Sequence, residues 1–281
     1  MPTIPRLLEP VPANRTYESV LNHFEVERAI ARRLMTADRQ ARKQIYSSMY
    51  DDLFAQVPDH PRLTRRGDQQ LTERMNRRKM KLVQPFVQAD GNFLEFGAGD
   101  CRFSFAMCQL ANRVFAVDIA DQIGPDVERP TNFELVIYNG YDLTLPDGSI
   151  STAFSDQLIE HLHPDDTEHH FRMVHRILVP GGVYIFRTPH RLTGPHDVSR
   201  YFSEQAEGFH LKEWTYSELA KLLEQIGYRA IKAYWFGRDQ LVRVPITAFR
   251  VTEAAMSQLP LALRKGRLRY LVPGISIAAY K

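Results

Sequence analysis

The sequence predicts an α/β fold, with a doubly wound, mostly parallel sheet of seven strands and a helical extension at the N-terminus. Two observations predict it. From about residue 90 onward, short apolar runs alternate with helical patterns, which is typical of βαβ units. Before residue 90 the chain is charged and its apolar residues follow helical spacing. We therefore expect a helical extension or lid over residues 1–88 and a sheet domain over residues 89–281, with insertions on the substrate side at about 189–214 and 238–272.

The N-terminal extension contains two well-marked helices. Apolar residues between Ile45 and Phe54 recur at intervals that place them on one broad helical face. Pro58 and Pro61 end this helix, because proline removes a backbone donor and restricts the residue before it. A basic helix follows over about 68–87. The basic side chains between residues 62 and 81 are Arg62, Arg65, Arg66, Arg74, Arg77, Arg78, Lys79 and Lys81.

The seven expected strands are the runs Phe93–Phe96, Val114–Val117, Phe133–Tyr138, Ile150–Phe154, Val183–Phe186, Ala230–Phe236 and Ile275–Ala279. Helical spacing between them predicts helices over about 103–110 and 171–178. A further helix begins at a capping box formed by Thr215 and Glu218, and Gly227 ends it. The insertion at 238–272 carries a helix near 246–256.

The composition excludes several classes of protein. With 281 residues, 44% of them apolar, the chain can bury a sizeable core, and 16 Phe and 12 Tyr argue against disorder. No apolar run approaches the ~20 residues that cross a bilayer, and the first residues lack the apolar segment of a secretory leader. Cys101 and Cys108 cannot form a disulfide framework, so we expect a cytoplasmic protein. The net charge of +3 does not indicate a nucleic-acid binder.

The segment 92–101 is the most informative part of the sequence. A strand leads directly into Gly97 and Gly99 and then into a helix, which brings backbone and free N–H groups close to a bound ligand. A dinucleotide fingerprint would need a third glycine where Arg102 stands. Asp100 within the loop would repel a pyrophosphate, whereas Glu95 before it suits a cationic ligand.

Glu95-Phe96-Gly97-Ala98-Gly99-Asp100 resembles the first motif of the class I S-adenosylmethionine-dependent methyltransferases. Asp118 matches the family's ribose-binding acid, and segments near 139–149, 154–162 and 178–182 resemble its later motifs in the same order. Cys101 departs from the pattern, because many members have a third glycine there. The resemblance covers about residues 90–190, and the helix after Thr215 extends it to about 237.

This resemblance implies a Rossmann-like methyltransferase fold, S-adenosylmethionine as methyl donor and S-adenosylhomocysteine as product. It implies that Asp118 binds the ribose and that Ile119 and Tyr141 form an adenine slot. In related enzymes N-terminal helices close over the donor, so Tyr46 and Tyr50 are expected to cover the site. The candidate donor-binding residues are Glu95, Gly97, Gly99, Asp100, Asp118, Ile119, Asn139, Gly140, Tyr141, Ser155, Asp156 and Gln157.

Histidines supply the candidate catalytic groups. The run from His161 to His170 matches no zinc-ligand spacing and reads as a helix start, so we expect no metal site. His161, or else His163, can face the donor methyl group. In the connection after the fifth strand, His190 and His196 are candidate general bases. Beside them, Asp197 and Arg200 are candidate orienting or acceptor-binding groups. The alternative is that this loop is held in shape by its own ion pairs.

These features together predict methyl transfer from S-adenosylmethionine to a small-molecule or glycan-type acceptor, at oxygen. One alternative is a tRNA or rRNA methyltransferase that uses the basic helix, although no aromatic side chains interleave that helix for base stacking. Another is a donor-binding protein without catalysis. We expect neither a nucleic-acid partner nor a membrane span, and a homodimer is compatible with the sequence.

Overall fold

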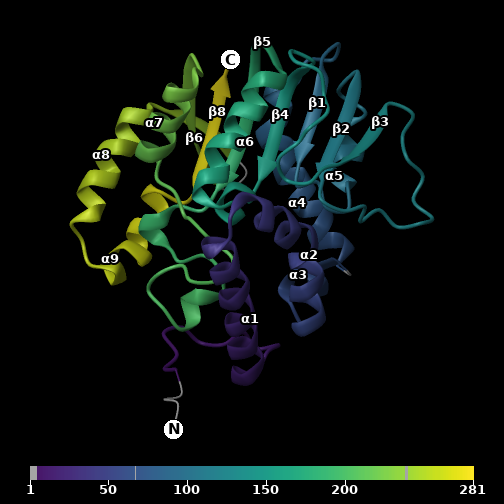
Figure 1. The fold of residues 1–281 in the computed structure, drawn as a ribbon. Helices are drawn as coiled ribbons and strands as arrows, with labels where there is room; N and C mark the ends of the chain where they lie inside the picture. Colours follow the sequence, from purple (N-terminus) through teal and green to yellow (C-terminus); the bar gives the residue numbers. More distant parts are fainter. Residues whose placement is uncertain (1–4, 67, 238–239) are drawn as a thin grey trace.

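The computed structural model describes residues 5–66, 68–237 and 240–281, whose strands form one eight-stranded sheet with the order β3-β2-β1-β4-β5-β8-β6-β7 (Figure 1). The strands are β1 (Asn92–Phe96), β2 (Arg113–Asp118), β3 (Phe133–Ile137), β4 (Ile150–Asp156), β5 (Leu178–Thr188), β6 (Ala230–Gly237), β7 (Gln240–Val244) and β8 (Ile275–Tyr280). Strands β1 to β5 are parallel, and β8 runs antiparallel between β5 and β6. The predicted α/β class with a mostly parallel sheet is confirmed.

The sheet has one strand more than the seven predicted. The extra strand is β7, which pairs antiparallel with β6 at the edge of the sheet. The sequence analysis placed its residues inside the insertion at 238–272. Strand β7 has no continuous apolar run in its sequence, and none of its residues is fully buried. Residues 238 and 239, the first two of that insertion, lie outside the described residues.

Helices cover both faces of the sheet and one of its edges. The α-helices are α1 (Tyr17–Thr36), α2 (Arg39–Gln56), α3 (Pro61–Arg66), α4 (Gln69–Val83), α5 (Arg102–Met107), α6 (Pro164–Ile177), α7 (Tyr216–Ile226), α8 (Ile246–Ser257) and α9 (Leu261–Lys265). In Figure 1, α6 and α7 lie in front of the sheet, α4 and α5 lie behind it, and α8 lies beside the edge at β6. The sheet is therefore doubly wound, as the sequence predicts.

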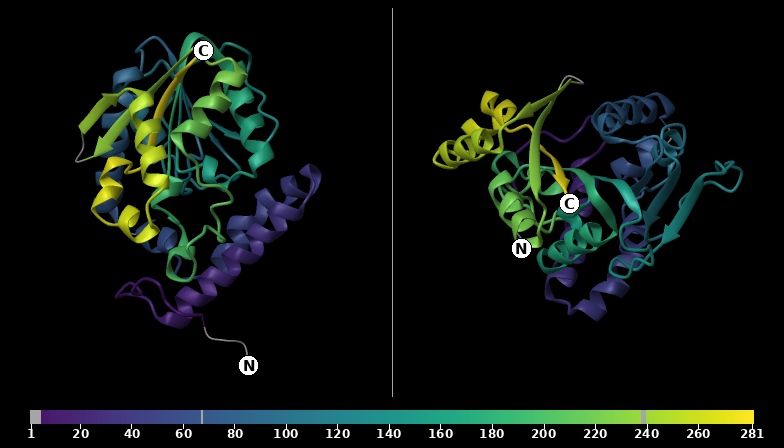
Figure 2. Two further views of the ribbon diagram at one scale, coloured as in Figure 1. Left: turned by 90° about the vertical axis from the view of Figure 1, so that its left-hand side faces the viewer. Right: turned by 90° about the horizontal axis from the view of Figure 1, so that it is seen from above.

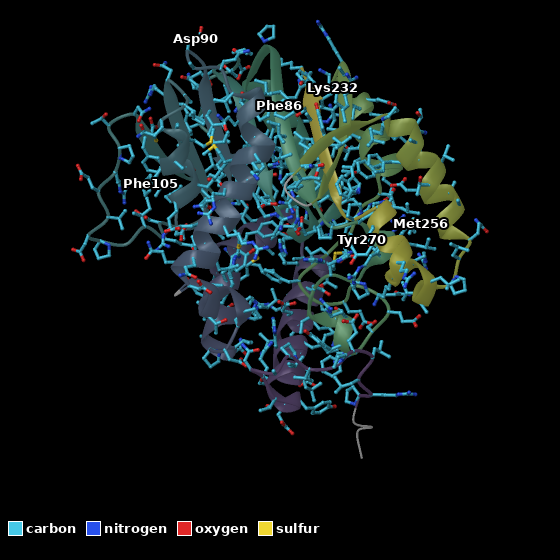
Figure 3. All side chains as sticks on the ribbon, turned by 180° about the vertical axis from the view of Figure 1, so that it is seen from behind. Phe86, Asp90, Phe105, Lys232, Met256 and Tyr270 are labelled. Atoms are coloured by element: carbon cyan, nitrogen blue, oxygen red, sulfur yellow. The ribbon has the colours of Figure 1, made fainter. Side chains whose placement is uncertain are left out.

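Side chains alternate between the two faces of β1, as they do in any strand. Phe93 packs with α4 and α5, whereas Leu94 and Phe96 pack with α6 and α7. Seen from behind (Figure 3), Phe86 follows α4, and its ring packs edge-on against Tyr234 of β6 at 5.7 Å. Two apolar cores, one on each face, therefore pack against the sheet and fix the positions of its strand ends.

The N-terminal helices α1, α2 and α3 lie across the end of the sheet at which the parallel strands finish (Figures 1 and 2). Tyr46, Met49 and Leu53 of α2 are buried, which confirms the apolar stripe predicted between residues 45 and 54. Asp68 caps α4, where the basic helix was predicted. None of the described helices is long and apolar enough to cross a membrane.

Strand order reverses between β1 and β4, and this point positions the site. Phe96 at the end of β1 pairs with Val117 of β2 on one side and Ser155 of β4 on the other. The connections from β1 and β4 then leave in opposite directions, which opens a crevice at the carboxyl ends of these strands. The helix predicted after Thr215 is confirmed, with both capping-box hydrogen bonds present.

Candidate functional site

A cavity, here called the loop cavity, lies at this reversal point under the N-terminal helices. Strand ends supply one wall and helix α2 supplies another. Its lining residues are Tyr46, Met49, Tyr50, Arg62, Gly97, Gly99, Asp118, Ile119, Gln122, Tyr138, Gly140, Asp156, Gln157, Leu158, His161 and Leu162. The cavity therefore combines backbone from the glycine loop with aromatic rings and two carboxylates.

The glycine loop turns through a series of left-handed residues. Gly97 and Gly99 have φ of 67° and 57°, a conformation that side chains with a Cβ rarely adopt. Cys101 also has a left-handed φ of 59°, and its side chain is buried. Cys101 therefore adopts the left-handed conformation at a steric cost on the order of 1–2 kcal/mol.

Asp118 joins the glycine loop to the end of β2. Its carboxylate accepts a hydrogen bond from Gly99 N at 2.7 Å and another from Ile119 N at 2.8 Å. Each oxygen keeps a second lone pair, and the side chain lines the loop cavity. Such a carboxylate can accept hydrogen bonds from a diol while it holds the loop in place.

Several predicted donor-binding residues lie outside the lining of the loop cavity. Glu95 is buried beneath the loop, where it accepts a hydrogen bond from Ser104 and pairs with Lys79. Asp100 points toward Arg102, and Asn139 caps its own turn at Tyr141 N. The two remaining residues are engaged elsewhere: Ser155 with Tyr184, and Tyr141 with Asp166.

Tyr141 belongs to a buried polar cluster that fastens α2 to the sheet domain. Arg42 of α2 makes two hydrogen bonds to Asp166 at the start of α6, of 2.8 and 2.9 Å. The hydroxyls of Tyr46 and Tyr141 also donate to Asp166. Burial raises the pKa of Asp166, but these hydrogen bonds outweigh it and hold the pKa below its usual range. The cluster keeps Tyr46 and Tyr50 over the loop cavity.

Some lining residues were not anticipated from the sequence. Tyr138 directly follows β3, so its position at a strand end was the available indication, and its ring lies where Tyr141 was expected. Arg62 was grouped with the basic run, yet its guanidinium lies 4.8 Å from the centre of the Tyr50 ring and lines the loop cavity. Arg62 reaches the cavity because α3 folds back over the strand ends, which sequence spacing does not reveal.

A second cavity, here called the histidine cavity, adjoins the first. The two share Tyr50, Arg62, Gln157 and His161. The lining residues of the histidine cavity are Pro12, Arg15, His23, Glu27, Tyr50, Leu53, His60, Pro61, Arg62, Gln157, His161, His196, Asp197, Val198, Arg200, Tyr201, Phe209 and His210. Gln157 has a left-handed φ of 58° where the cavities meet, and such strain in a residue other than glycine gathers at functional sites.

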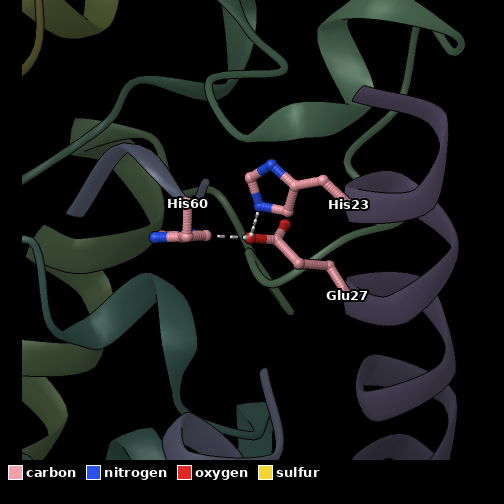
Figure 4. A group of neighbouring side chains, drawn as sticks. All are labelled: His23, Glu27 and His60. Atoms are coloured by element: carbon pink, nitrogen blue, oxygen red, sulfur yellow. Dashed lines mark hydrogen bonds and ion pairs between the residues drawn. The ribbon is translucent and has the colours of Figure 1, made fainter. Parts of the chain in front are cut away.

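One wall of the histidine cavity is the cluster of His23, Glu27 and His60 (Figure 4). Glu27 Oε1 lies 2.8 Å from His23 Nε2 and 3.7 Å from His60 Nε2. Its Oε2 accepts a hydrogen bond from Phe209 N. Burial raises the pKa of Glu27, but the hydrogen bond with His23 and the nearby ring of His60 outweigh it and lower the pKa to about 2.

Because of this lowered pKa, the free energy of unfolding is expected to fall at acidic pH. Because the folded pKa is below the unfolded value of about 4.5, the contribution of Glu27 is present above that value and is lost toward pH 2. Over this pH range we expect the free energy of unfolding of the wild type to fall by on the order of 3 kcal/mol more than that of Glu27→Gln. Urea unfolding at a series of pH values measures it, and parallel profiles for both proteins would contradict the expectation.

The predicted catalytic histidines occupy different environments. His161 lines both cavities, and its Nδ1 donates to the Phe209 carbonyl at 2.8 Å. Burial lowers the pKa of His161 to about 3, so the ring is neutral at physiological pH. His196 lines the histidine cavity. His190 is fully buried, lines neither of these cavities, and lies 2.7 Å from Glu253.

The other candidates from the same loop have structural partners. Asp197 lines the histidine cavity and accepts hydrogen bonds from Ser199 N and His210 N. Arg200 lines it as well and pairs with Glu9 near the N-terminus. His163, the alternative to His161, caps α6 by accepting a hydrogen bond from Asp165 N.

The described side chains of the basic stretch do not form one continuous exposed surface. Lys79 turns inward to Glu95, Arg78 lies over the Phe236 ring, and exposed Arg77 pairs with Glu73. The side chains of Arg65 and Arg66 lie outside the described part of the structure. The described members of this run therefore point in several directions.

Comparisons with known proteins agree with this geometry. The family model described as a methyltransferase domain matches residues 94–186, from β1 to β5. A probable S-adenosylmethionine-dependent methyltransferase of Mycolicibacterium smegmatis is 30% identical over 141 residues, which are 50% of this chain and 52% of that protein. One of Mycobacterium tuberculosis is 30% identical over 136 residues, or 48% of this chain and 47% of that protein. The chain thus spans about half the length of these curated relatives.

Solved structures share the fold at low identity. An S-adenosylmethionine-dependent methyltransferase of Archaeoglobus fulgidus has a TM-score of 0.53 at 18% identity, with 77% of this chain and 96% of that one covered. One of Thermotoga maritima, titled a possible histamine N-methyltransferase, has a TM-score of 0.51 at 14% identity, with 92% and 99% covered. These matches identify residues 94–186 as a methyltransferase domain, and the chain is similar to S-adenosylmethionine-dependent methyltransferases in this domain and shares their doubly wound fold.

Proposed function

We propose that this protein transfers a methyl group from S-adenosylmethionine, bound in the loop cavity, to a hydroxyl of a polar small-molecule or glycan-type acceptor in the histidine cavity. The observation that carries the proposal is the junction of the two cavities at Tyr50, Arg62, Gln157 and His161. A donor and an acceptor held on either side of this junction would meet there. Positioning of the two reactants accounts for a large part of catalysis in such transfers.

The residues of the loop cavity suit the parts of the donor. The sulfonium of S-adenosylmethionine supplies an activated methyl group, so the protein needs to bind and orient it. Asp118 would accept hydrogen bonds from the ribose hydroxyls, and Ile119 and Tyr138 would contact the adenine. Asp156, at the end of β4, would face the positive charge of the donor.

The residues of the histidine cavity suit a polar acceptor. Arg15, Asp197, Arg200 and His210 bring polar and charged groups to its lining, which match hydroxyl groups. His196 remains a candidate base because it lines this cavity. The burial of His190 and its bond to Glu253 favour a structural role for that residue.

The RNA alternative has weaker support. An RNA site of the kind weighed from the sequence would use the basic helix α4 as one surface, whereas Lys79 is turned inward and Arg77 is paired with Glu73. The acceptor side of the junction is formed by α1, α3 and the loop after β5 instead. None of the basic side chains of α4 lines this cavity.

The donor assignment can be tested by calorimetry. Asp118→Ala is expected to weaken binding of S-adenosylhomocysteine at least ~tenfold, because a charged hydrogen-bond acceptor for the ribose is lost. Asp121→Ala is a matched control, since Asp121 is exposed, pairs with Arg129 and does not line the loop cavity. Binding of a nicotinamide dinucleotide in place of S-adenosylhomocysteine would overturn the assignment.

The acceptor class can be tested with methyl-tritiated S-adenosylmethionine. The protein is incubated in parallel with a protein-free extract of cellular small molecules and with purified total RNA. We expect the label to enter an ether in the low-mass fraction and to be absent from the RNA. Label in RNA would favour the alternative, and label on nitrogen would contradict O-methylation.

A further inference from the structure

We propose that Glu160, His161 and His210 hold a divalent transition-metal ion at the junction of the two cavities. One ring nitrogen of each histidine and one carboxylate oxygen of Glu160 lie within 4.8 Å of one another. Two imidazoles and a carboxylate are a ligand set for zinc and similar ions, and the ligands of an ion with bonds near ~2.1 Å lie ~3–4 Å apart. A small inward movement of these side chains would complete the site.

The strongest observation is the carboxylate of Glu160, which has no exposed surface. Its Oε2 accepts a hydrogen bond from Thr188 at 2.9 Å, whereas Oε1 is buried with no hydrogen-bond partner among the described residues. A buried carboxylate oxygen without a partner is costly, and native structures rarely keep one without a reason. A cation between Oε1 and the two rings would supply that partner.

Each ring is also fixed by its other nitrogen. His161 Nδ1 donates to the Phe209 carbonyl, and His210 Nδ1 donates to the Glu213 carboxylate, both at 2.8 Å. These bonds place a proton on Nδ1 of each ring, so Nε2 is the atom that would bind an ion. Metal-binding histidines almost always donate their second nitrogen to a carbonyl or a carboxylate in this way.

The neighbouring cluster of His23, Glu27 and His60 has the same residue types but lacks this arrangement. Arg15 Nη1 lies 2.9 Å from His23 Nδ1, and a guanidinium can only donate. His23 Nδ1 must therefore accept, so Nε2 carries the proton and donates it to Glu27. The Oε2 of Glu27 is occupied by Phe209 N. This cluster is already satisfied by hydrogen bonds and offers a matched control.

The position of the site indicates its use, and this step rests on the proposed function. His161 and His210 line the histidine cavity, so the open coordination positions would face the acceptor. An acceptor hydroxyl bound there would lose its proton to water more easily, because the ion stabilises the oxyanion. The oxygen lone pair then forms the bond to the methyl carbon, and the C–S bond breaks with its electrons left on sulfur. The ion thus selects an acceptor whose reacting group is a hydroxyl.

Titration of the metal-free, full-length protein with Co²⁺ tests the site, followed by the visible absorption of the bound ion. Glu160→Gln keeps the shape of the side chain and its Thr188 partner, and is expected to weaken Co²⁺ binding at least ~100-fold, as is His210→Asn. Glu213→Gln, which alters the partner of a ligand, is expected to weaken it ~10–100-fold. His60→Asn is the control and is expected to leave the affinity within about threefold of wild type.

Absence of Co²⁺, Zn²⁺ and Mn²⁺ binding to the wild type would overturn the proposal, as would unchanged affinity in Glu160→Gln. Loss of binding in His60→Asn would assign the ion to the other cluster and contradict the proposal as well. S-adenosylhomocysteine binding is measured on the same samples. Failure of that binding alone would refute the proposed donor site, whereas failure of Co²⁺ binding alone would refute the metal site.

Discussion

Arg42→Met is expected to lower the free energy of unfolding by about 3–5 kcal/mol, because it leaves Asp166 buried without its cationic partner. Both side chains are 7% exposed, and two hydrogen bonds join them. Tyr46 and Tyr141 donate to the same carboxylate but carry no charge to balance it. Urea unfolding followed by circular dichroism measures the change.

The same substitution is expected to weaken S-adenosylhomocysteine binding, because α2 carries Tyr46, Met49 and Tyr50 into the loop cavity. Arg172→Met is the control, since its ion pair with Glu168 is half exposed and is worth less than ~1 kcal/mol. Arg42→Met combined with Asp166→Leu should recover stability relative to Arg42→Met. Equal stability of Arg42→Met and Arg172→Met would contradict the role of this pair.

His161→Asn is expected to lower kcat by roughly 10²–10⁴-fold, because it removes a ligand of the proposed ion, which would stabilise the reacting oxygen by several kcal/mol. The ring lies where the two cavities meet, so the loss should affect the transition state far more than the binding of the donor. Single-turnover assays with the labelled donor, once an acceptor is known, separate the two effects.

His175→Gln is the matched control for His161→Asn, since His175 packs against Tyr228 and lines neither of the two cavities. Its turnover should stay near that of the wild type. If His161→Asn also retained normal turnover, the reacting oxygen would have to be activated elsewhere, with His196 as the next candidate.

Much of the fold could be predicted from local patterns. Apolar runs predicted the strands of the parallel sheet, because parallel strands are buried on both faces. Thr215, Glu218 and Gly227 predicted a helix whose caps the structure reproduces. Strand β7 was missed because an exposed edge strand has no such apolar run.

The candidate site could be predicted only where its residues follow strand ends. Gly97, Asp118 and Gln157 do so, and they line the loop cavity. Glu95 does not line the loop cavity. Because side chains alternate along β1, it points to the face of the sheet that α4 covers, where it pairs with Lys79 of that helix. The junction of His161 with His210 joins two distant segments, and no spacing in the sequence encodes that contact.

A crystal structure of the protein with S-adenosylhomocysteine bound tests the central claim most directly. We predict that the ribose hydroxyls lie within hydrogen-bond distance of Asp118, that the adenine lies between Ile119 and Tyr138, and that the sulfur faces the junction at Gln157 and His161. Ligand density outside the loop cavity, or a sulfur that points away from the histidine cavity, would contradict the account.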